Sequence, residues 1–138
     1  MWTHEHTAET PLTREAIWKV LADIDNWARW DTSMESVALL GPFAVGSQLS
    51  MTPIGQDAIV STISEITENE RYADETEFNG LTLRFSHTLV ALPAGGTRVV
   101  HRLEIDGPGA DAAGPEIGPM ITEDFPEAME GLLRCAAE

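Results

Sequence analysis

The segment from Leu81 to Asp106 constrains the fold of this chain most strongly, because it has the pattern of one long β-hairpin. Two runs of alternating residues flank a turn-rich centre at residues 93–96, Pro-Ala-Gly-Gly. Successive side chains of a strand point to opposite faces, so one face of this hairpin is apolar and the other is charged. The exceptions on the apolar face are His87 and His101. Any function therefore depends on what that face encloses.

The rest of the chain predicts one α+β domain over residues 1–138. Residues 1–9 alternate as a first strand, and Thr13 caps a helix. A second short helix is expected over residues 23–31. Strands are expected over 34–40, 47–52, 58–67, 71–78 and the two arms of the hairpin. Residues 107–118 are predicted to be a loop, and residues 119–137 a helix kinked at Pro126. This order segregates the helices from an antiparallel sheet.

Charge limits the classes of partner. The formal net charge is −15, with 8 lysine and arginine residues against 23 aspartate and glutamate residues. Nucleic acids and anionic membranes bind basic patches, so neither is expected as a partner. The chain shows no signal peptide and no apolar run near the length of a membrane span, which predicts a soluble, cytoplasmic protein without membrane insertion. The single Cys135 is expected to be buried rather than reactive.

The turns predict the strand register. A two-residue turn at Asn79-Gly80 places Tyr72 opposite His87 and Asp74 opposite Phe85. A five-residue connection over 92–96 places His87 opposite His101, whereas a longer one leaves the two histidines diagonal. On the outer face, the same registers place an arginine between two glutamates, in the order Glu75, Arg84 and Glu104, which sheets favour.

Several segments together resemble the START/Bet v 1-like superfamily, specifically its bacterial polyketide cyclase/dehydrase-like (SRPBCC) branch. The segments span nearly the whole chain and are Glu15–Asp23, Trp27, Trp30, Thr62–Ile66, Gly95–Arg102, Gly107-Pro108, Pro126 and Leu132-Leu133. The resemblance implies a helix-grip fold, a seven-stranded antiparallel sheet curled around a long C-terminal helix. It also implies a cavity between them that takes a hydrophobic small molecule. It fixes the fold far better than the function.

In that fold the first strand lies beside the last. A polar row of His6, His101, His87 and Tyr72 is therefore expected across four strands, with Asp74 one inward position from Tyr72. The residues expected to line the cavity come from the sheet, the second helix and the last helix: Trp30, Tyr72, Asp74, Thr76, Phe78, Leu83, Phe85, His87, His101, Leu103, Met120 and Phe125. Trp18, Trp27 and Trp30 are expected mainly to pack the helices, and residues 107–118 to form the lip of the entrance.

Three interpretations of the polar row remain open. The side chains bond to each other or to water beneath the helix, as buried polar groups must. They orient a carbonyl or hydroxyl of a ligand. Alternatively, His87 or His101 acts as a base, with Tyr72 as proton donor and Asp74 fixing a histidine tautomer, in the cyclisation or dehydration of a polyketide. No cofactor is expected. The spacing has no compact metal-binding motif, and no metal is expected.

The sequence thus favours a protein that binds a polyketide- or lipid-like molecule, as a monomer or homodimer. A polyketide cyclase or dehydratase is the first alternative, and it requires Tyr72, His87 and His101 to face open volume rather than one another. The second alternative is a protein-interaction module with a collapsed cavity. It requires a contiguous exposed apolar patch around Trp27, Trp30 and Phe43.

Overall fold

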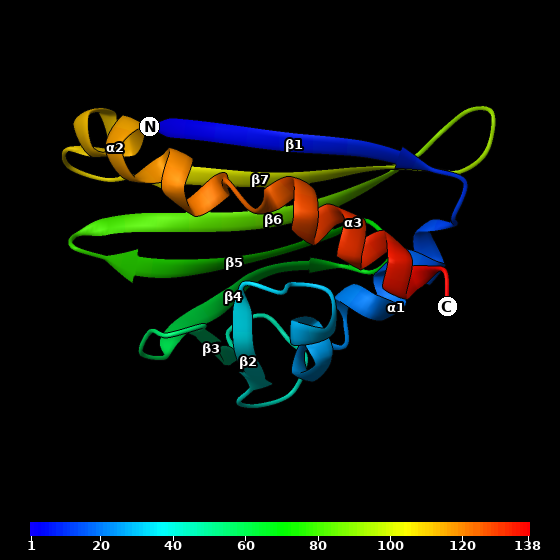
Figure 1. The fold of residues 1–138 in the computed structure, drawn as a ribbon, viewed down its shortest axis with the longest axis horizontal. Coiled ribbons are helices and arrows are strands. Elements are labelled where there is room, and N and C mark those ends of the chain that lie inside the picture. Colours follow the sequence, from blue (N-terminus) through cyan, green and yellow to red (C-terminus); the bar gives the residue numbers. More distant parts are fainter.

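The structure, a computed structural model that describes residues 1–138, contains one seven-stranded antiparallel sheet gripped on one face by helices (Figure 1). In chain order the elements are β1 (Trp2–Thr10), α1 (Arg14–Leu21), the 3₁₀ helix η1 (Ile24–Arg29), β2 (Met34–Leu39), β3 (Gln48–Pro53), β4 (Ile59–Thr67), β5 (Arg71–Phe78), β6 (Leu81–Ala91), β7 (Thr97–Asp106), α2 (Ala110–Thr122) and α3 (Phe125–Ala136). The strand order β1-β7-β6-β5-β4-β3-β2 brings the first strand beside the last. The helix-grip prediction is therefore confirmed.

The predicted register of β5 against β6 is also confirmed, and of the two registers left open for β6 and β7 the structure has the one with a five-residue connection. Tyr72 lies opposite His87, and Asp74 lies opposite Phe85. His87 faces His101, and His101 faces His6 on β1. Because the side-chain period of a strand is two, these pairings put the whole polar row on the inner face of the sheet.

The outer face of the sheet carries charges. Arg84 lies between Glu75 and Glu104, at 3.1 and 3.7 Å between nitrogen and carboxylate oxygen. It also contacts Glu65 at 2.9 Å. Exposed ion pairs of this kind contribute little stability. The ion pairs hold the arginine side chains on the outer face, away from the core.

The C-terminal region differs from the sequence prediction. Residues 107–118 were expected as a loop, but α2 begins at Ala110, and the single kinked helix is in fact two helices separated at Glu123 and Asp124. Pro126 lies in the first turn of α3, where a missing N–H costs nothing, so it does not kink a helix interior. The predicted second helix is a short 3₁₀ helix.

Tertiary packing explains why α2 is helical despite two internal prolines. Gly114 and Gly118 lie directly against the side chain of Trp2, and a Cβ atom on either glycine would overlap the Trp2 ring. Pro115 and Pro119 are exposed and remove two backbone donors from the helix. The stability of α2 therefore depends on the Trp2 indole, which fills the space left by Gly114 and Gly118 (the glycine notch).

The core consists of two clusters of buried side chains. The larger lies under α1, η1 and α3 and includes Trp18, Trp27 and Trp30. The smaller lies under α2 and the start of α3, around Leu83, Leu103 and Phe125. As expected, the three tryptophans pack the helices. Cys135 is half-buried and unpaired. None of the helices has both the length and the hydrophobicity needed to cross a bilayer.

Candidate functional site

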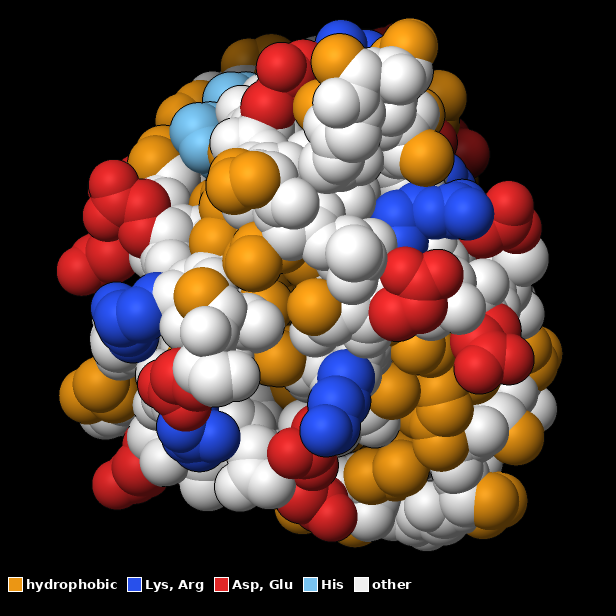
Figure 2. Space-filling view, turned by 90° about the vertical axis from the view of Figure 1, so that its right-hand side faces the viewer, with side chains coloured by type: hydrophobic (Ala, Val, Ile, Leu, Met, Phe, Trp, Pro, Cys, Tyr) orange, Lys and Arg blue, Asp and Glu red, His pale blue; other side chains and the backbone are white.

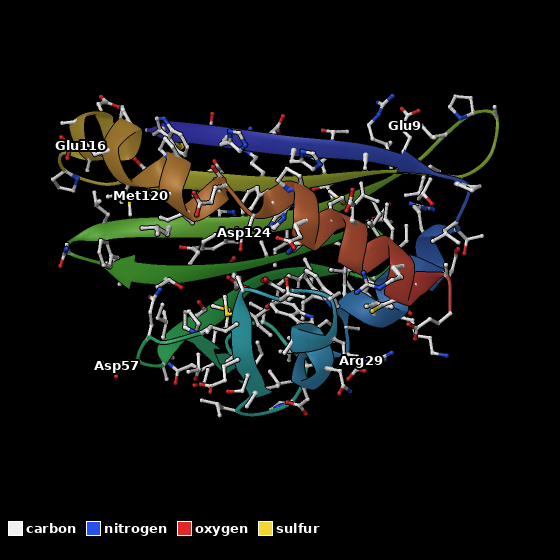
Figure 3. All side chains as sticks on the ribbon, in the orientation of Figure 1. Glu9, Arg29, Asp57, Glu116, Met120 and Asp124 are labelled. Carbon is white, nitrogen blue, oxygen red and sulfur yellow. The ribbon has the colours of Figure 1, made fainter.

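The candidate site occupies the inner face of β5, β6 and β7, where Tyr72, Asp74, His87 and His101 are all buried. Strand alternation directs these four side chains inward, and the register places them next to one another. The break between α2 and α3 carries Asp124 (Figure 3) and is followed at once by Phe125, which packs on the site.

Tyr72 and Asp74 form a buried hydrogen-bonded pair. The Tyr72 hydroxyl donates to Oδ2 of Asp74 at 2.9 Å. Burial raises the pKa of Asp74 to about 7, although the Tyr72 hydrogen bond and Arg84 partly oppose it. Burial also raises the pKa of Tyr72, and Asp74 raises it further, so this phenol stays protonated. The carboxyl group consequently changes protonation near neutrality.

The two histidines are stacked and neutral. Their ring centroids lie 4.1 Å apart, and His101 stacks on Phe125 at 3.8 Å. Burial lowers the pKa of His87 to about 4. The pKa of His101 is also well below its ordinary value, first because of burial and then because of His87 and the β1 histidines. The rings of Tyr72, His87 and His101 therefore face one another in a row, with Tyr72 6.3 Å from His87 and with Phe125 stacked on His101 at the other end.

Three buried polar atoms at this site have no hydrogen-bond partner: Trp30 Nε1, Asp74 Oδ1 and His87 Nδ1. The neighbouring Trp27 is different, since its Nε1 donates to the Leu21 carbonyl at 2.9 Å. A buried polar group without a partner costs about 1–3 kcal/mol, and native interiors contain few of them. The presence of three such atoms on neighbouring residues of one interior needs an explanation.

Aromatic rings surround these atoms. The ring of Trp30 lies 6.0 Å from His87, and the ring of Trp27 lies 5.3 Å from Tyr72. Phe43 stacks parallel to Tyr72 at 6.2 Å. The contacts of Trp27 and Phe43 with this site were missed in the sequence-based list of lining residues. The spacing of Trp27 and Trp30 by three residues was the available signal, but no local pattern places Phe43 there.

The remaining predicted lining residues divide into a group that faces the interior and an exposed pair. In the first group, Leu83, Leu103 and Phe125 are buried in the smaller cluster, and the half-buried Phe85 packs against it. Thr76 is also buried and hydrogen-bonds with Ser61.

The predictions for Phe78 and Met120 were wrong, because their side chains are 47% and 70% exposed. Phe78 lies at the end of β5 beyond the cover of the helices, and Met120 lies on the solvent side of α2. Neither side chain reaches the interior.

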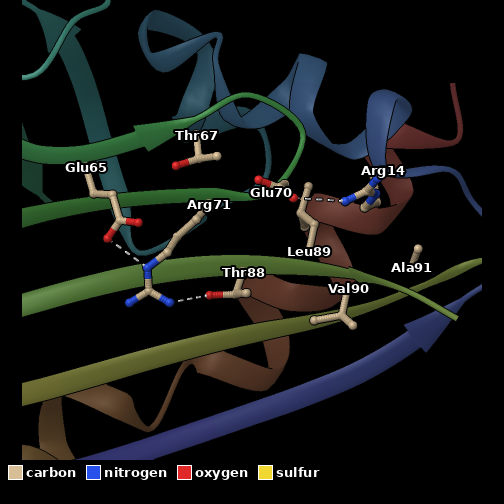
Figure 4. Close-up of a pocket in the computed structure, with 9 residues that line it drawn as sticks. All are labelled: Arg14, Glu65, Thr67, Glu70, Arg71, Thr88, Leu89, Val90 and Ala91. Carbon is tan, nitrogen blue, oxygen red and sulfur yellow. Dashed lines mark hydrogen bonds and ion pairs between the residues drawn. The ribbon is translucent and has the colours of Figure 1, made fainter.

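Two hollows open on the outer face of the sheet, and neither lies between sheet and helices. One, of about 360 Å³, is lined by Arg14, Arg71, Thr88 and their neighbours (Figure 4). The other, of about 380 Å³, lies around Arg84 and Glu104. Their linings are charged and largely paired, as in the contact of Arg71 with Glu65 at 3.0 Å. The inner polar groups Tyr72, Asp74, His87 and His101 are themselves buried and so are shut off from solvent. No group of three or more His, Cys, Asp or Glu side chains is arranged to hold a metal ion.

A sheet gripped by C-terminal helices around an apolar interior with few polar groups defines a protein of the START/Bet v 1-like class. A family model described as "Polyketide cyclase / dehydrase and lipid transport" matches residues 1–138. The chain therefore belongs to the polyketide cyclase/dehydrase and lipid transport family. A comparison with curated proteins found no match.

Solved structures agree with this fold. Ara h 8.0201 is similar with a TM-score of 0.79 and 16% identity, over 98% of this chain and 97% of that chain. Zhui aromatase/cyclase from Streptomyces sp. R1128 has a TM-score of 0.74 and 17% identity, over 98% and 93%. A START superfamily protein from Mycobacterium smegmatis has a TM-score of 0.66 and 18% identity, over 96% and 92%. At such identities the likeness establishes the fold alone.

Proposed function

We propose that this protein binds a hydrophobic small molecule, polyketide- or lipid-like, between the inner face of β5–β7 and helices α2 and α3. The observation that carries the proposal is the group of three unpartnered polar atoms on Trp30, Asp74 and His87, buried within an apolar interior. Ligand sites in proteins are mostly apolar and contain a few placed polar groups that fix orientation. A bound molecule would supply the missing hydrogen bonds.

Binding requires the interior to open, and α2 is the element suited to move. Pro115 and Pro119 deprive it of two backbone donors, and its N-cap residue, Gly109, provides no side-chain hydrogen bond. Helices with few hydrogen bonds open at low free-energy cost. Displacement of α2 would uncover the smaller cluster and Phe125, and behind them the histidine stack.

Two measurements test this proposal. Native mass spectrometry of protein purified from its own host should show a defined hydrophobic molecule near one-to-one occupancy. The uncharged probe Nile red should bind the stripped protein and gain fluorescence. A clean unliganded mass together with no Nile red binding by the folded protein would refute the proposal.

A cyclase or dehydratase is the second candidate function. Tyr72, His87 and His101 face one another, so the arrangement that the sequence analysis required for these three residues is not present. The pKa of Asp74 favours this residue as the catalytic group instead. A carboxyl group with a pKa of about 7 is suited to accept a proton from a carbon beside a carbonyl. The Tyr72 hydroxyl bonded to it would hold its orientation. His87 is a weaker base than the sequence suggested, because its pKa is about 4. The base in this candidate mechanism is therefore Asp74.

Deuterium exchange tests the second candidate. The protons beside the carbonyl of dodecan-2-one should exchange with D₂O faster in the presence of the protein. Asp74→Asn should abolish the acceleration, whereas Glu75→Gln, on the outer face, should retain it. Exchange at the buffer rate with wild-type protein excludes the catalytic role.

The packing of the aromatic residues weighs against the protein-interaction alternative. The side chains of Trp27 and Trp30 are only 5% and 3% exposed, and Phe43 is half-buried against Tyr72. The exposed apolar patch that this alternative requires is therefore missing around these residues. At the end of the molecule formed by α1 and the C-terminus of α3, charged side chains separate the hydrophobic ones into several groups (Figure 2).

A further inference from the structure

We infer that the ligand carries an uncharged hydrogen-bonding group, a hydroxyl or keto oxygen, which binds at Trp30, Asp74 and His87, and that the site rejects carboxylates. This inference rests on the proposed binding function and adds the chemical class of the ligand. It follows from which atoms lack partners and from where the charges of the molecule lie.

The unpartnered atoms provide both a donor and acceptors. Trp30 Nε1 can only donate a hydrogen bond. Asp74 Oδ1 accepts when the carboxyl group is ionised, and the carboxyl group can donate when it is protonated. His87 is a neutral imidazole, with one donor and one acceptor nitrogen. A hydroxyl can accept from the indole and donate to Asp74 or His87. A keto oxygen can accept from the indole and from a protonated Asp74.

These atoms belong to neighbouring residues. Tyr72 lies opposite His87 in the sheet, and its hydroxyl bonds the Asp74 carboxyl group. The His87 ring lies 6.0 Å from the Trp30 ring. The three residues are therefore neighbours in one part of the interior, with the Trp27 ring 6.3 Å from that of His87. Such neighbours suit a single functional group on an otherwise apolar ligand.

No cation is available to a bound carboxylate. None of the eight lysine and arginine side chains is buried. The four arginines of β5–β7 pair with glutamates on the outer face: Arg71, Arg84, Arg98 and Arg102. Burial of an ionised group without a partner is strongly unfavourable. An anionic ligand would therefore enter with its charge uncompensated.

Acidic residues at the helix break strengthen this exclusion. Asp31 follows Trp30 directly, and burial together with nearby Asp124 raises the pKa of Asp31. Asp124 in turn precedes Phe125, which covers the histidine stack. Repulsion between like charges disfavours a second carboxylate close to a first. Asp74 in its ionised form and the acids at the break both oppose an anionic ligand.

An ammonium group also fits less well than a hydroxyl. It could pair with an ionised Asp74, but it has no lone pair to accept the Trp30 N–H. The indole would remain buried without a partner, which is costly. The uncharged group is the one that satisfies donor and acceptor together.

Four ligands of equal chain length test the inference: dodecan-1-ol, dodecan-2-one, dodecanoate and dodecylammonium. Each should be titrated against the complex with Nile red at neutral pH, below its micelle concentration. The alcohol and the ketone should displace the probe at concentrations at least about tenfold below those needed for dodecanoate. Dodecylammonium should fall between the two. Equal or tighter binding of dodecanoate overturns the inference, as does dodecylammonium binding best.

Matched variants assign the effect to the site. Asp74→Asn should reduce the preference for alcohol over dodecanoate severalfold. Glu75→Gln removes the same charge from the outer face, where it acts only weakly on Asp74, and should change the preference far less. Trp30→Phe should weaken the ketone severalfold, because the ketone oxygen needs a donor. If Glu75→Gln and Asp74→Asn change the preference equally, overall charge explains it and the inference fails.

The outcomes separate this inference from the proposed function. Probe binding without discrimination among the four ligands overturns the inference and leaves the binding function standing. No binding of Nile red or of any of the four ligands to the folded protein overturns both.

Discussion

His101 lies face to face with Phe125, with ring centroids 3.8 Å apart and planes 12° from parallel. His87 covers the other side of His101 at 4.1 Å. The imidazole is thus a spacer between β6 and the first turn of α3. Aromatic pairs of this kind contribute about 0.5–1.5 kcal/mol beyond the burial of their area.

This stack predicts that the ring of His101 matters to stability more than its nitrogens. His101→Phe should keep the stack and change the free energy of unfolding by less than about 1.5 kcal/mol. His101→Ala should lower it by about 2–4 kcal/mol, because a cavity replaces the ring. Urea denaturation of both variants measures the difference. Equal losses for the two would show that a polar contact of His101 governs its role.

The register of these residues was predictable from sequence because two turns fix it. Asn79-Gly80 and the five-residue connection over 92–96 set which positions face each other, and the period of two carries each pairing along the strands. The placement of Tyr72 opposite His87 required no knowledge of the helices, whereas the pairing of His87 with His101 depended on the length of the second connection, which the sequence left open.

The arrangement of the helices that cover this face of the sheet was not predictable in the same way. Gly114, Pro115, Gly118 and Pro119 break every local helix signal, yet α2 is helical because its glycines fit around Trp2, 112 residues before Gly114 in the chain. Alternation gave Phe78 an inward face, but it did not show that no helix reaches the end of β5. Stacking of Phe125 on His101 depends on where α2 stops, which no local pattern showed.

Gly131 sets how closely α3 approaches η1, and this gives the second prediction. A Cβ atom at residue 131 would overlap the backbone carbonyl of Trp30. Backbone cannot rotate away as a side chain can, so Gly131→Ala should lower the free energy of unfolding by about 1–3 kcal/mol, despite alanine's better helix propensity. Glu130→Ala, on the exposed side of α3, should be close to neutral. Thermal denaturation compares the two, and a stabilised Gly131→Ala protein would contradict the packing described here.

The pKa of Asp74 predicts an unusual dependence of stability on pH. In the folded protein this pKa is about 7, above its ordinary value of 3.8. Between about pH 4 and pH 7 the folded state therefore holds a proton that the unfolded state has lost, and stability falls as pH rises through this window. Asp74→Asn removes this effect. Its free energy of unfolding relative to wild type should increase across the window, whereas that of Glu75→Gln should change much less, because Glu75 is only the smallest of the causes acting on this pKa. Denaturant titrations at several pH values provide the test, and a flat difference for Asp74→Asn would refute it.

The pKa of His87 predicts the opposite dependence of stability on pH. Its pKa is about 4 in the folded protein and 6.5 ordinarily, so between these values the unfolded state binds the extra proton. This contribution to stability is present above about pH 6.5 and is lost as pH falls towards about 4. His101 contributes in the same direction and remains in a His87→Phe variant. That variant should consequently lose less stability than wild type on acidification, as measured by denaturation at pH values across this range. An equal loss would mean that His87 is protonated in the folded state.

The contact between Trp2 and the glycine notch of α2 predicts a change in the local stability of α2, the helix proposed to move. Gly118→Ala improves intrinsic helix propensity by about 1 kcal/mol, but its Cβ would overlap the Trp2 ring. Because several Trp2 ring atoms occupy the space of that Cβ, α2 amides should exchange hydrogen faster in the variant while α3 amides stay protected. Adding Trp2→Ala to Gly118→Ala removes the overlap, so in the Trp2→Ala background the alanine should slow exchange in α2. Met120→Ala, at an exposed position of the same helix, should leave exchange nearly unchanged. Slower exchange in the single Gly118→Ala variant would show that Trp2 yields easily and does not hold α2 in place.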